Sequence, residues 1–102
     1  MTPDPDAIAA AVLECGSVAD LAGGFAGEIA TYLPGRRVTG VQVRPDGRVV
    51  VHVVGHYGPS TARIAEEVTA AVRAVAGEVD VHVGIDDLLL PPSRAGAPAG
   101  PA

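Results

Sequence analysis

Hydrophobic residues recur at two different spacings along the chain, which predicts helices in some segments and strands in others. A first helix is expected over residues 5–15, where the apolar side chains at helical spacing are Ile8, Val12 and Cys15. Asp4 and Pro5 suit the beginning of this helix, because aspartate caps a free N–H and proline has none to leave unpaired. Gly16 is typical of a helix end. The apolar residues that follow are expected to pack beneath the helix.

A period of two then predicts three strands, which cover residues 28–33, 38–44 and 49–54. Pro34 and Gly35 stand at the central positions of a type II turn between the first two of them. The run at 44–48 indicates a second hairpin, with Gly47 at the left-handed position. These signals predict a meander of three antiparallel strands.

A second helix is expected after Ser60 or Thr61, either of which can cap it. Its apolar stripe comprises Ile64, Val68, Val72 and Val75, and Gly77 ends it. A fourth strand over residues 79–85 alternates strictly between apolar and polar residues. Because a strand–helix–strand crossover returns parallel, this strand should run parallel to the third strand or to the first. The sequence leaves these two edges open.

The element order α-β-β-β-α-β predicts an α+β fold in two layers, a four-stranded mixed sheet with two helices on one face. Residues 1–90 are expected to form a single domain. Proline, alanine and glycine dominate residues 91–102, which are expected to be disordered because they bury too little to offset their ordering entropy.

Composition excludes several classes of function. Twelve acidic residues outnumber seven basic ones, all arginine, and the net charge of -5 argues against a nucleic-acid partner. The lone Cys15 can form neither an internal disulfide nor, by itself, a structural zinc site. No secretory leader and no apolar run long enough to cross a bilayer is recognised, so a cytoplasmic location without direct membrane insertion is expected.

The face of the sheet away from the helices is the first candidate for a functional surface. Strand alternation places Val50, His52 and Val54 on this face. An apolar central strand there, with Tyr32 near it, would form an interaction patch. The alternative is that polar neighbours keep the face hydrated.

His52, Asp80 and His82 form a second candidate, a ligand or metal site on the same outer face. Its spacing is permissive only, because third and fourth metal ligands are not clearly placed, and surface histidines are the favoured interpretation. Arg36 and Arg37 beside the turn could hold an anion or a partner's carboxylate.

No catalytic set is recognised, and no cofactor is predicted. Cys15 is expected to behave as a small buried hydrophobe, Ser60 as a helix cap and His56 as a loop residue. Asp86 and Asp87 are expected at a solvated strand end, with a weak cation or arginine contact as the alternative.

Three segments together resemble the alkaline-shock-protein, or Gls-type, envelope stress response family in its short actinobacterial form: 30–38, 40–43 and 79–87. The resemblance covers about residues 5–88 and consists of hydrophobic and glycine positions. It implies a non-enzymatic cytoplasmic protein that self-assembles and, in some species, is held at the membrane by a membrane-anchored protein partner. It implies no catalytic residues.

We therefore expect a self-associating scaffold that acts in the stress response through protein contacts and forms a homo-oligomer. The predicted interaction surface comprises Tyr32, Arg36, Arg37, Val50, His52, Val54 and His82. The alternative is a ligand- or metal-binding domain that uses His52, Asp80 and His82.

Overall fold

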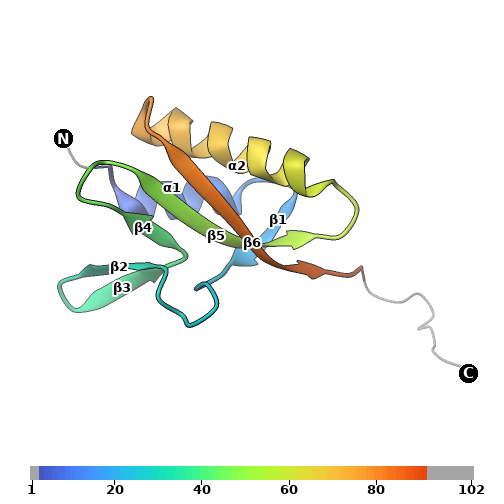
Figure 1. Ribbon diagram of the computed structural model, residues 1–102, viewed down its shortest axis with the longest axis horizontal. Helices are drawn as coiled ribbons and strands as arrows, with labels where there is room; N and C mark the ends of the chain where they lie inside the picture. The colour runs from blue at the N-terminus through green and yellow to red at the C-terminus, as the bar shows by residue number, and fades with distance from the viewer. Residues whose placement is uncertain (1–2, 92–102) are drawn as a thin grey trace, which may run out of the picture.

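The structure is a computed structural model that describes residues 3–91 (Figure 1). Within these residues the chain forms two helices and six strands. In chain order they are α1 (Pro5–Leu13), β1 (Val18–Leu21), β2 (Ala30–Leu33), β3 (Arg36–Thr39), β4 (Val41–Val43), β5 (Val49–His56), α2 (Thr61–Ala76) and β6 (Val81–Leu89).

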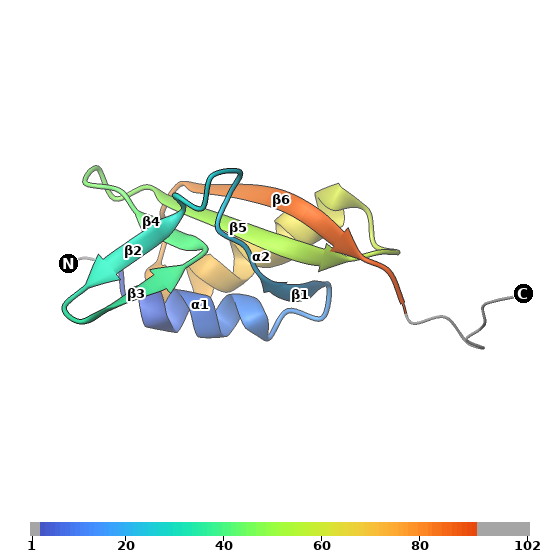
Figure 2. The same cartoon turned by 90° about the horizontal axis from the view of Figure 1, so that it is seen from below.

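Strand β5 is the centre of a four-stranded mixed sheet. β4 and β1 both pair with it antiparallel along one side, β4 with its first half and β1 with its last. β6 runs parallel to β5 along the other side (Figure 2). The helical crossover through α2 therefore places the final strand beside the predicted third strand, which decides between the two edges that the sequence left open.

Both predicted helix caps are confirmed. The Asp4 carboxylate accepts a hydrogen bond from the Asp6 N–H at 3.0 Å, and the Ser60 hydroxyl accepts one from the Arg63 N–H at 3.1 Å. α2 ends at Gly77, whose φ of 85° is a conformation that glycine adopts without strain. α1 stops at Leu13, two residues before the predicted end.

Both helices pack on one face of the sheet, so the predicted two-layer α+β fold is confirmed. Alternate residues of β5 point toward them, because successive side chains of a strand face opposite sides. The side chains with no exposed surface are Ile8, Val12, Val41, Val49, Val51, Val53, Ile64, Val68 and Val72. All of these are β-branched, which suits strands and gives the small core well-defined rotamers.

The predicted meander is wrong at its second strand, which Gly40 divides into β3 and β4. Gly40 has a φ of 89°, and its N–H donates to Ile29 while its carbonyl accepts from the His52 N–H. One residue thus joins two sheets. β2 and β3 form a separate two-stranded hairpin instead of two strands of the main sheet.

The fourth place in the main sheet belongs to β1, a strand that the sequence analysis missed. β1 has four residues, and only Val18 and Leu21 in it are large and apolar, so alternation is too short to be recognised. The last strand continues to Leu89, beyond the predicted end at residue 85. Of the tail expected to be disordered, residues 92–102 lie outside the described part of the chain.

Candidate functional site

The side chain of His52 lies against Gly84 on the outer face of the sheet. The two residues are partners in the parallel pairing of β5 with β6. A Cβ atom at position 84 would lie 2.5–2.7 Å from three atoms of the imidazole ring. Any residue other than glycine at this position would therefore displace the ring.

Asp86 fixes the orientation of this imidazole. Its Oδ1 atom lies 2.7 Å from His52 Nδ1, and its Oδ2 atom accepts the N–H of Gly24 at 2.9 Å. A β-bulge places Asp86 here, because Val53 pairs with Ile85 and Val54 with Asp87, which leaves Asp86 as the extra residue. A proton on Nδ1 faces the carboxylate, so Nε2 lies on the other side of the ring.

The segment between β1 and β2, residues 22–29, lies across the outer face, and we call it the cover loop (Figure 2). Two bonds that attach it to the sheet are the one from the Gly24 N–H to Asp86 and the one from the Ala22 N–H to the His52 carbonyl, at 2.8 Å. Near its tip, Phe25 is fully exposed. The loop therefore covers part of the sheet while presenting an aromatic side chain to solvent.

A recess of about 310 Å³ opens beside the cover loop. Its lining comprises Ile29, Arg44, Arg48, Val50, His52 and His82. The two histidine rings lie 6.4 Å apart, because β5 and β6 pair directly, a point that the sequence left open. Arg48 also contacts Asp46 at 3.1 Å, which offsets part of the positive charge. An apolar floor with a basic rim suits a small anion.

The expectation of an open apolar face is wrong at Val50, whose side chain is only 4% exposed. Ile29 of the cover loop, itself buried, lines the same recess. Val54 is half-buried, and its pairing partners are Asp20 on one side and Asp87 on the other. The alternative of a face kept hydrated by polar neighbours therefore describes this end of the sheet better.

Asp80 does not join the two histidines. It lines a different recess, near Asp46 and Glu78. Within residues 3–91, no group of three histidine, cysteine, aspartate or glutamate side chains is placed to hold a metal ion. The carboxylate that meets His52 is Asp86, which the sequence analysis assigned to a solvated strand end.

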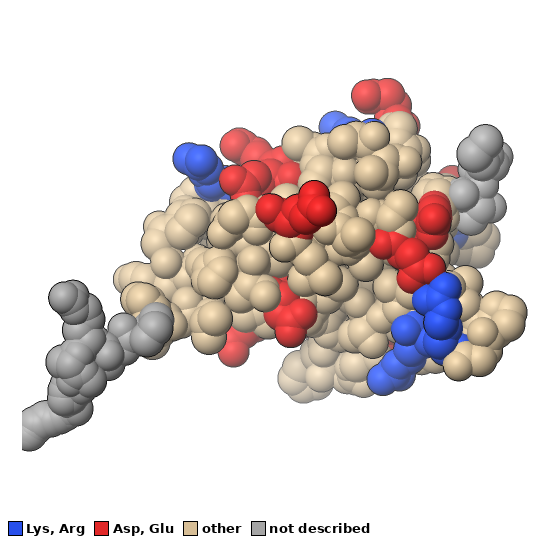
Figure 3. Space-filling model, turned by 180° about the vertical axis from the view of Figure 1, so that it is seen from behind, with Lys and Arg blue, Asp and Glu red and all other residues tan. Residues whose placement is uncertain are grey.

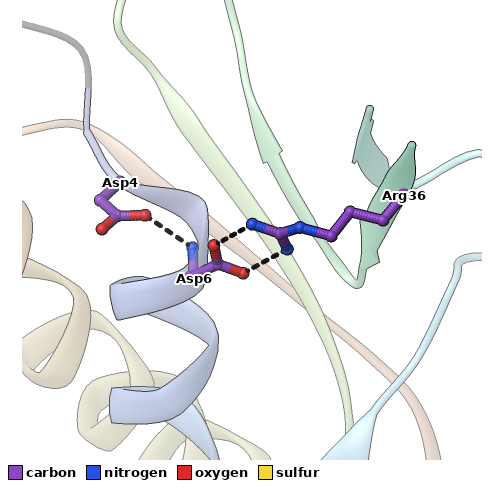
Figure 4. Close-up of polar contacts among 3 residues, drawn as sticks. All are labelled: Asp4, Asp6 and Arg36. Carbon is purple, nitrogen blue, oxygen red and sulfur yellow. Dashed lines mark hydrogen bonds and ion pairs between the residues drawn. The ribbon is translucent and has the colours of Figure 1, made fainter. Parts of the chain in front are cut away.

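The predicted arginine pair divides between two roles. Arg36 forms a bidentate ion pair with Asp6 of α1, with nitrogen–oxygen distances of 2.9 and 2.7 Å (Figure 4). This contact lowers the pKa of the Asp6 carboxyl and ties the hairpin to the first helix. Arg37 is exposed and lies opposite Tyr32, which is 69% exposed. These two side chains remain available on the hairpin.

The outer edge of β6 is unpaired in the described part of the chain, since β5 is its one neighbour in the sheet. The Asp80 carbonyl accepts from the Val49 N–H, so the backbone of residues 80, 82 and 84 faces β5. Residues 81, 83 and 85 therefore point their N–H and C=O groups toward the open edge. Figure 2 shows β6 along the border of the molecule, with β5 on one side of it.

Cys15 and Ser17, in the segment that follows α1, form polar contacts with Glu67 of α2. Ser17 is buried and donates both its backbone N–H and its hydroxyl to one oxygen of Glu67, which lowers the pKa of that carboxyl. Burial, and secondarily the negative charge of Glu67, raises the pKa of the Cys15 thiol. This arrangement suits a structural cysteine, as expected.

The remaining charges are dispersed. Acidic side chains lie in several small groups over the face seen from behind, and the largest basic group lies at one end of it (Figure 3). No described helix is both long enough and apolar enough to span a bilayer.

The sequence analysis missed Gly24, Gly84 and Asp86 as parts of this site. The only available signal was Gly84, because glycine inside an alternating strand indicates close approach of another group. Comparisons with protein-family models, with curated proteins and with solved structures found no match to the chain.

Proposed function

We propose that the chain is a non-enzymatic scaffold that self-associates through the open edge of β6. The observation that carries this proposal is the unpaired outer edge of a strand nine residues long. Such an edge presents a row of free N–H and C=O groups, which form hydrogen bonds with any extended chain placed beside it.

The sequence of β6 supports this role. Proteins protect exposed edges with lysine, with proline or with very short strands. β6 contains neither lysine nor proline, and Val81, Val83 and Ile85 favour extended backbone. Its protective features, the bulge at Asp86 and the charges of Asp86 and Asp87, lie toward the end of the strand.

The resemblance to the alkaline-shock-protein family supplies the biological context of the proposal. In that context the scaffold acts in the cytoplasm during envelope or alkaline stress, as a homo-oligomer that a membrane-anchored protein recruits. The exposed Tyr32 and Arg37 on the hairpin then form the second surface, which is free to bind that partner.

Light scattering after size exclusion, over a wide range of protein concentration, tests the scaffold. A mass that rises above the 10.2 kDa monomer with concentration is the expected result, because mass action makes association concentration-dependent. A monomer at every concentration up to about 1 mM would overturn the proposal, because weaker association would leave little oligomer in any cell.

The recess beside the cover loop favours a second candidate function, binding of a small anion. Arg44 and His82 are exposed at its rim, and Val50 forms part of its floor. Titration with inorganic phosphate, followed through the NMR signals of the histidine rings, tests this function. In the unmodified protein these signals should shift until the site is saturated, and Arg44→Gln should weaken the apparent affinity. Arg63→Gln, which removes an arginine on α2 away from the recess, is the matched control and should leave the affinity unchanged. Absence of saturation in the unmodified protein would exclude a phosphate site.

A further inference from the structure

We propose that β6 pairs antiparallel with β6 of a second copy, around a two-fold axis that passes beside Gly84. This inference rests on the proposed scaffold function and specifies its interface. Two sheets joined in this way form one continuous sheet, with the helices of both copies on the same face. A two-fold interface is self-complementary and closes after two copies.

The alternation of side chains restricts the register. Directly opposed residues in a sheet must point to the same face. Val83 and Ile85 pack toward the core, while His82 and Asp86 face the other side. A register centred on Gly84 meets this condition, because it places Val83 opposite Ile85 and His82 opposite Asp86.

The hydrogen-bonding groups of the backbone fit the same register. Val83 and Ile85 direct their N–H and C=O groups toward the open edge, as the bond from the Val49 N–H to the Asp80 carbonyl requires. Opposed across the axis, Val83 of one copy and Ile85 of the other exchange both hydrogen bonds of an antiparallel pair. The symmetry repeats this exchange on the other side of Gly84. The bulged residues then lie at the ends of the paired segment.

Charge distinguishes this register from the one centred on Val83. Centring on Gly84 places each His82 opposite Asp86 of the second copy, a pair that attracts when the imidazole is protonated and hydrogen-bonds when it is neutral. A register centred on Val83 would instead oppose Asp80 and Asp86, two carboxylates. Each copy carries a net charge of -5, so a register without such a repulsive pair is favoured.

The side of α2 that borders this edge carries small residues. Glu67 marks the side toward α1, and Ala65 and Thr69 lie on the opposite side of the helix. Arg73 on that same side donates to the Val79 carbonyl, just before β6 begins. A shallow recess of about 360 Å³ lies along these small side chains, and Glu66 and Arg73 also line it. A second copy therefore meets no bulky apolar side chain there.

Disulfide trapping tests the register directly. His82→Cys and Asp86→Cys are made separately in a Cys15→Ala background, and the two proteins are mixed under mild oxidation. In the proposed pairing these positions are a non-hydrogen-bonded pair about 4.5 Å apart, within the range that a disulfide spans. The mixture should give a cross-linked heterodimer. His82→Cys alone should not, because its two copies lie about 13 Å apart along the strands.

Circular dichroism of each cysteine variant checks its fold, because Asp86 also holds His52 and the cover loop. Val83→Cys mixed with Ile85→Cys is the second pair, and it leaves Asp86 intact. Cross-linking of neither pair in a protein that still associates would overturn the register while the scaffold stands. Equal cross-linking in His82→Cys alone would also overturn it.

Charge reversal provides the matched comparison. His82→Glu sets a carboxylate against Asp86 of the second copy and should weaken association at least tenfold. Tyr32→Glu adds the same charge on the remote hairpin and should leave association unchanged. The opposite result would place self-association on the hairpin and overturn the edge interface. A monomeric unmodified protein would instead refute the scaffold function itself.

Discussion

The imidazole of His52 occupies the space that a side chain at position 84 would fill, so His52 and Gly84 form one packing unit across two strands. Because the ring is also bonded to Asp86, it cannot turn aside without losing a hydrogen bond. Position 84 must therefore be glycine for the His52 ring to pack as it does.

Gly84→Ala should destabilise the protein by about 1–3 kcal/mol, the usual effect of overpacking a filled site. Alanine is otherwise at least as favourable as glycine within a strand, so the loss reports the ring contact. Urea unfolding measures it. Gly16→Ala is the control, because a Cβ atom there has nothing within 4 Å.

The double variant His52→Ala with Gly84→Ala separates the ring contact from backbone effects. Gly84→Ala should lower the free energy of unfolding much less in the His52→Ala background than in the unmodified protein, because the ring that it would displace is gone. If the losses of the two single variants simply add, the contact between the ring and position 84 does not carry the effect.

Local patterns predicted the elements that are long or clearly terminated. The Ser60 cap of α2, the alternation of β5 and the turn at Gly35 depend on neighbours in sequence, and they agree with the structure. The predicted stripe of α2 is buried at Ile64, Val68 and Val72 and is wrong at Val75, which is 48% exposed. The strand β1 and the division of the predicted second strand at Gly40 could not be predicted from neighbours in sequence. A four-residue strand has too little alternation to recognise, and Gly40 bends the chain because of contacts with distant segments.

The same distinction applies to the candidate site. The outward phasing of His52 and His82 follows from strand alternation alone, and the structure brings their rings together. Asp86 reaches His52 only because a bulge adds one residue to β6, and no local pattern predicts that bulge. Val50 is covered by a loop whose position depends on the Gly24 bond to Asp86.

Gly40→Ala should cost more stability than Gly47→Ala, although both glycines have a φ of 89°. The left-handed backbone costs about 1–2 kcal/mol in either variant. A Cβ atom at 40 would also lie 2.8 Å from Leu21 Cβ and 3.1 Å from the Ala22 carbonyl, whereas at 47 it meets nothing. The difference in free energy of unfolding measures this crowding, and equal losses would exclude it.

Cys15 should react slowly with a thiol-specific disulfide reagent at neutral pH. Burial raises the pKa of its thiol, so the thiolate that reacts is scarce, and the packed helices restrict access. The rate should rise on unfolding in urea and, in the folded protein, as the pH rises. If the thiol reacted as fast in the folded protein as in the unfolded chain, it would be neither protected by packing nor raised in pKa.

The contact between Ser17 and Glu67 predicts how stability depends on pH. The hydrogen bonds from Ser17 lower the pKa of Glu67 below its ordinary value of 4.5. A carboxyl whose pKa falls on folding adds stability above its unfolded pKa and loses that contribution as the pH falls through the folded pKa. Glu67→Gln should therefore be less stable than the unmodified protein at pH 7, since charge-assisted bonds exceed neutral ones.

The difference between these two proteins should shrink as the pH falls below about 4.5 and vanish once Glu67 is protonated in both states. Urea unfolding across that range measures it, with Glu66→Gln as the control that leaves both Ser17 bonds intact. Ser17→Ala should remove the hydroxyl bond and bring the pKa of Glu67 back toward its ordinary value. A difference that persists unchanged in acid would mean that Glu67 acts through packing and not through its charge.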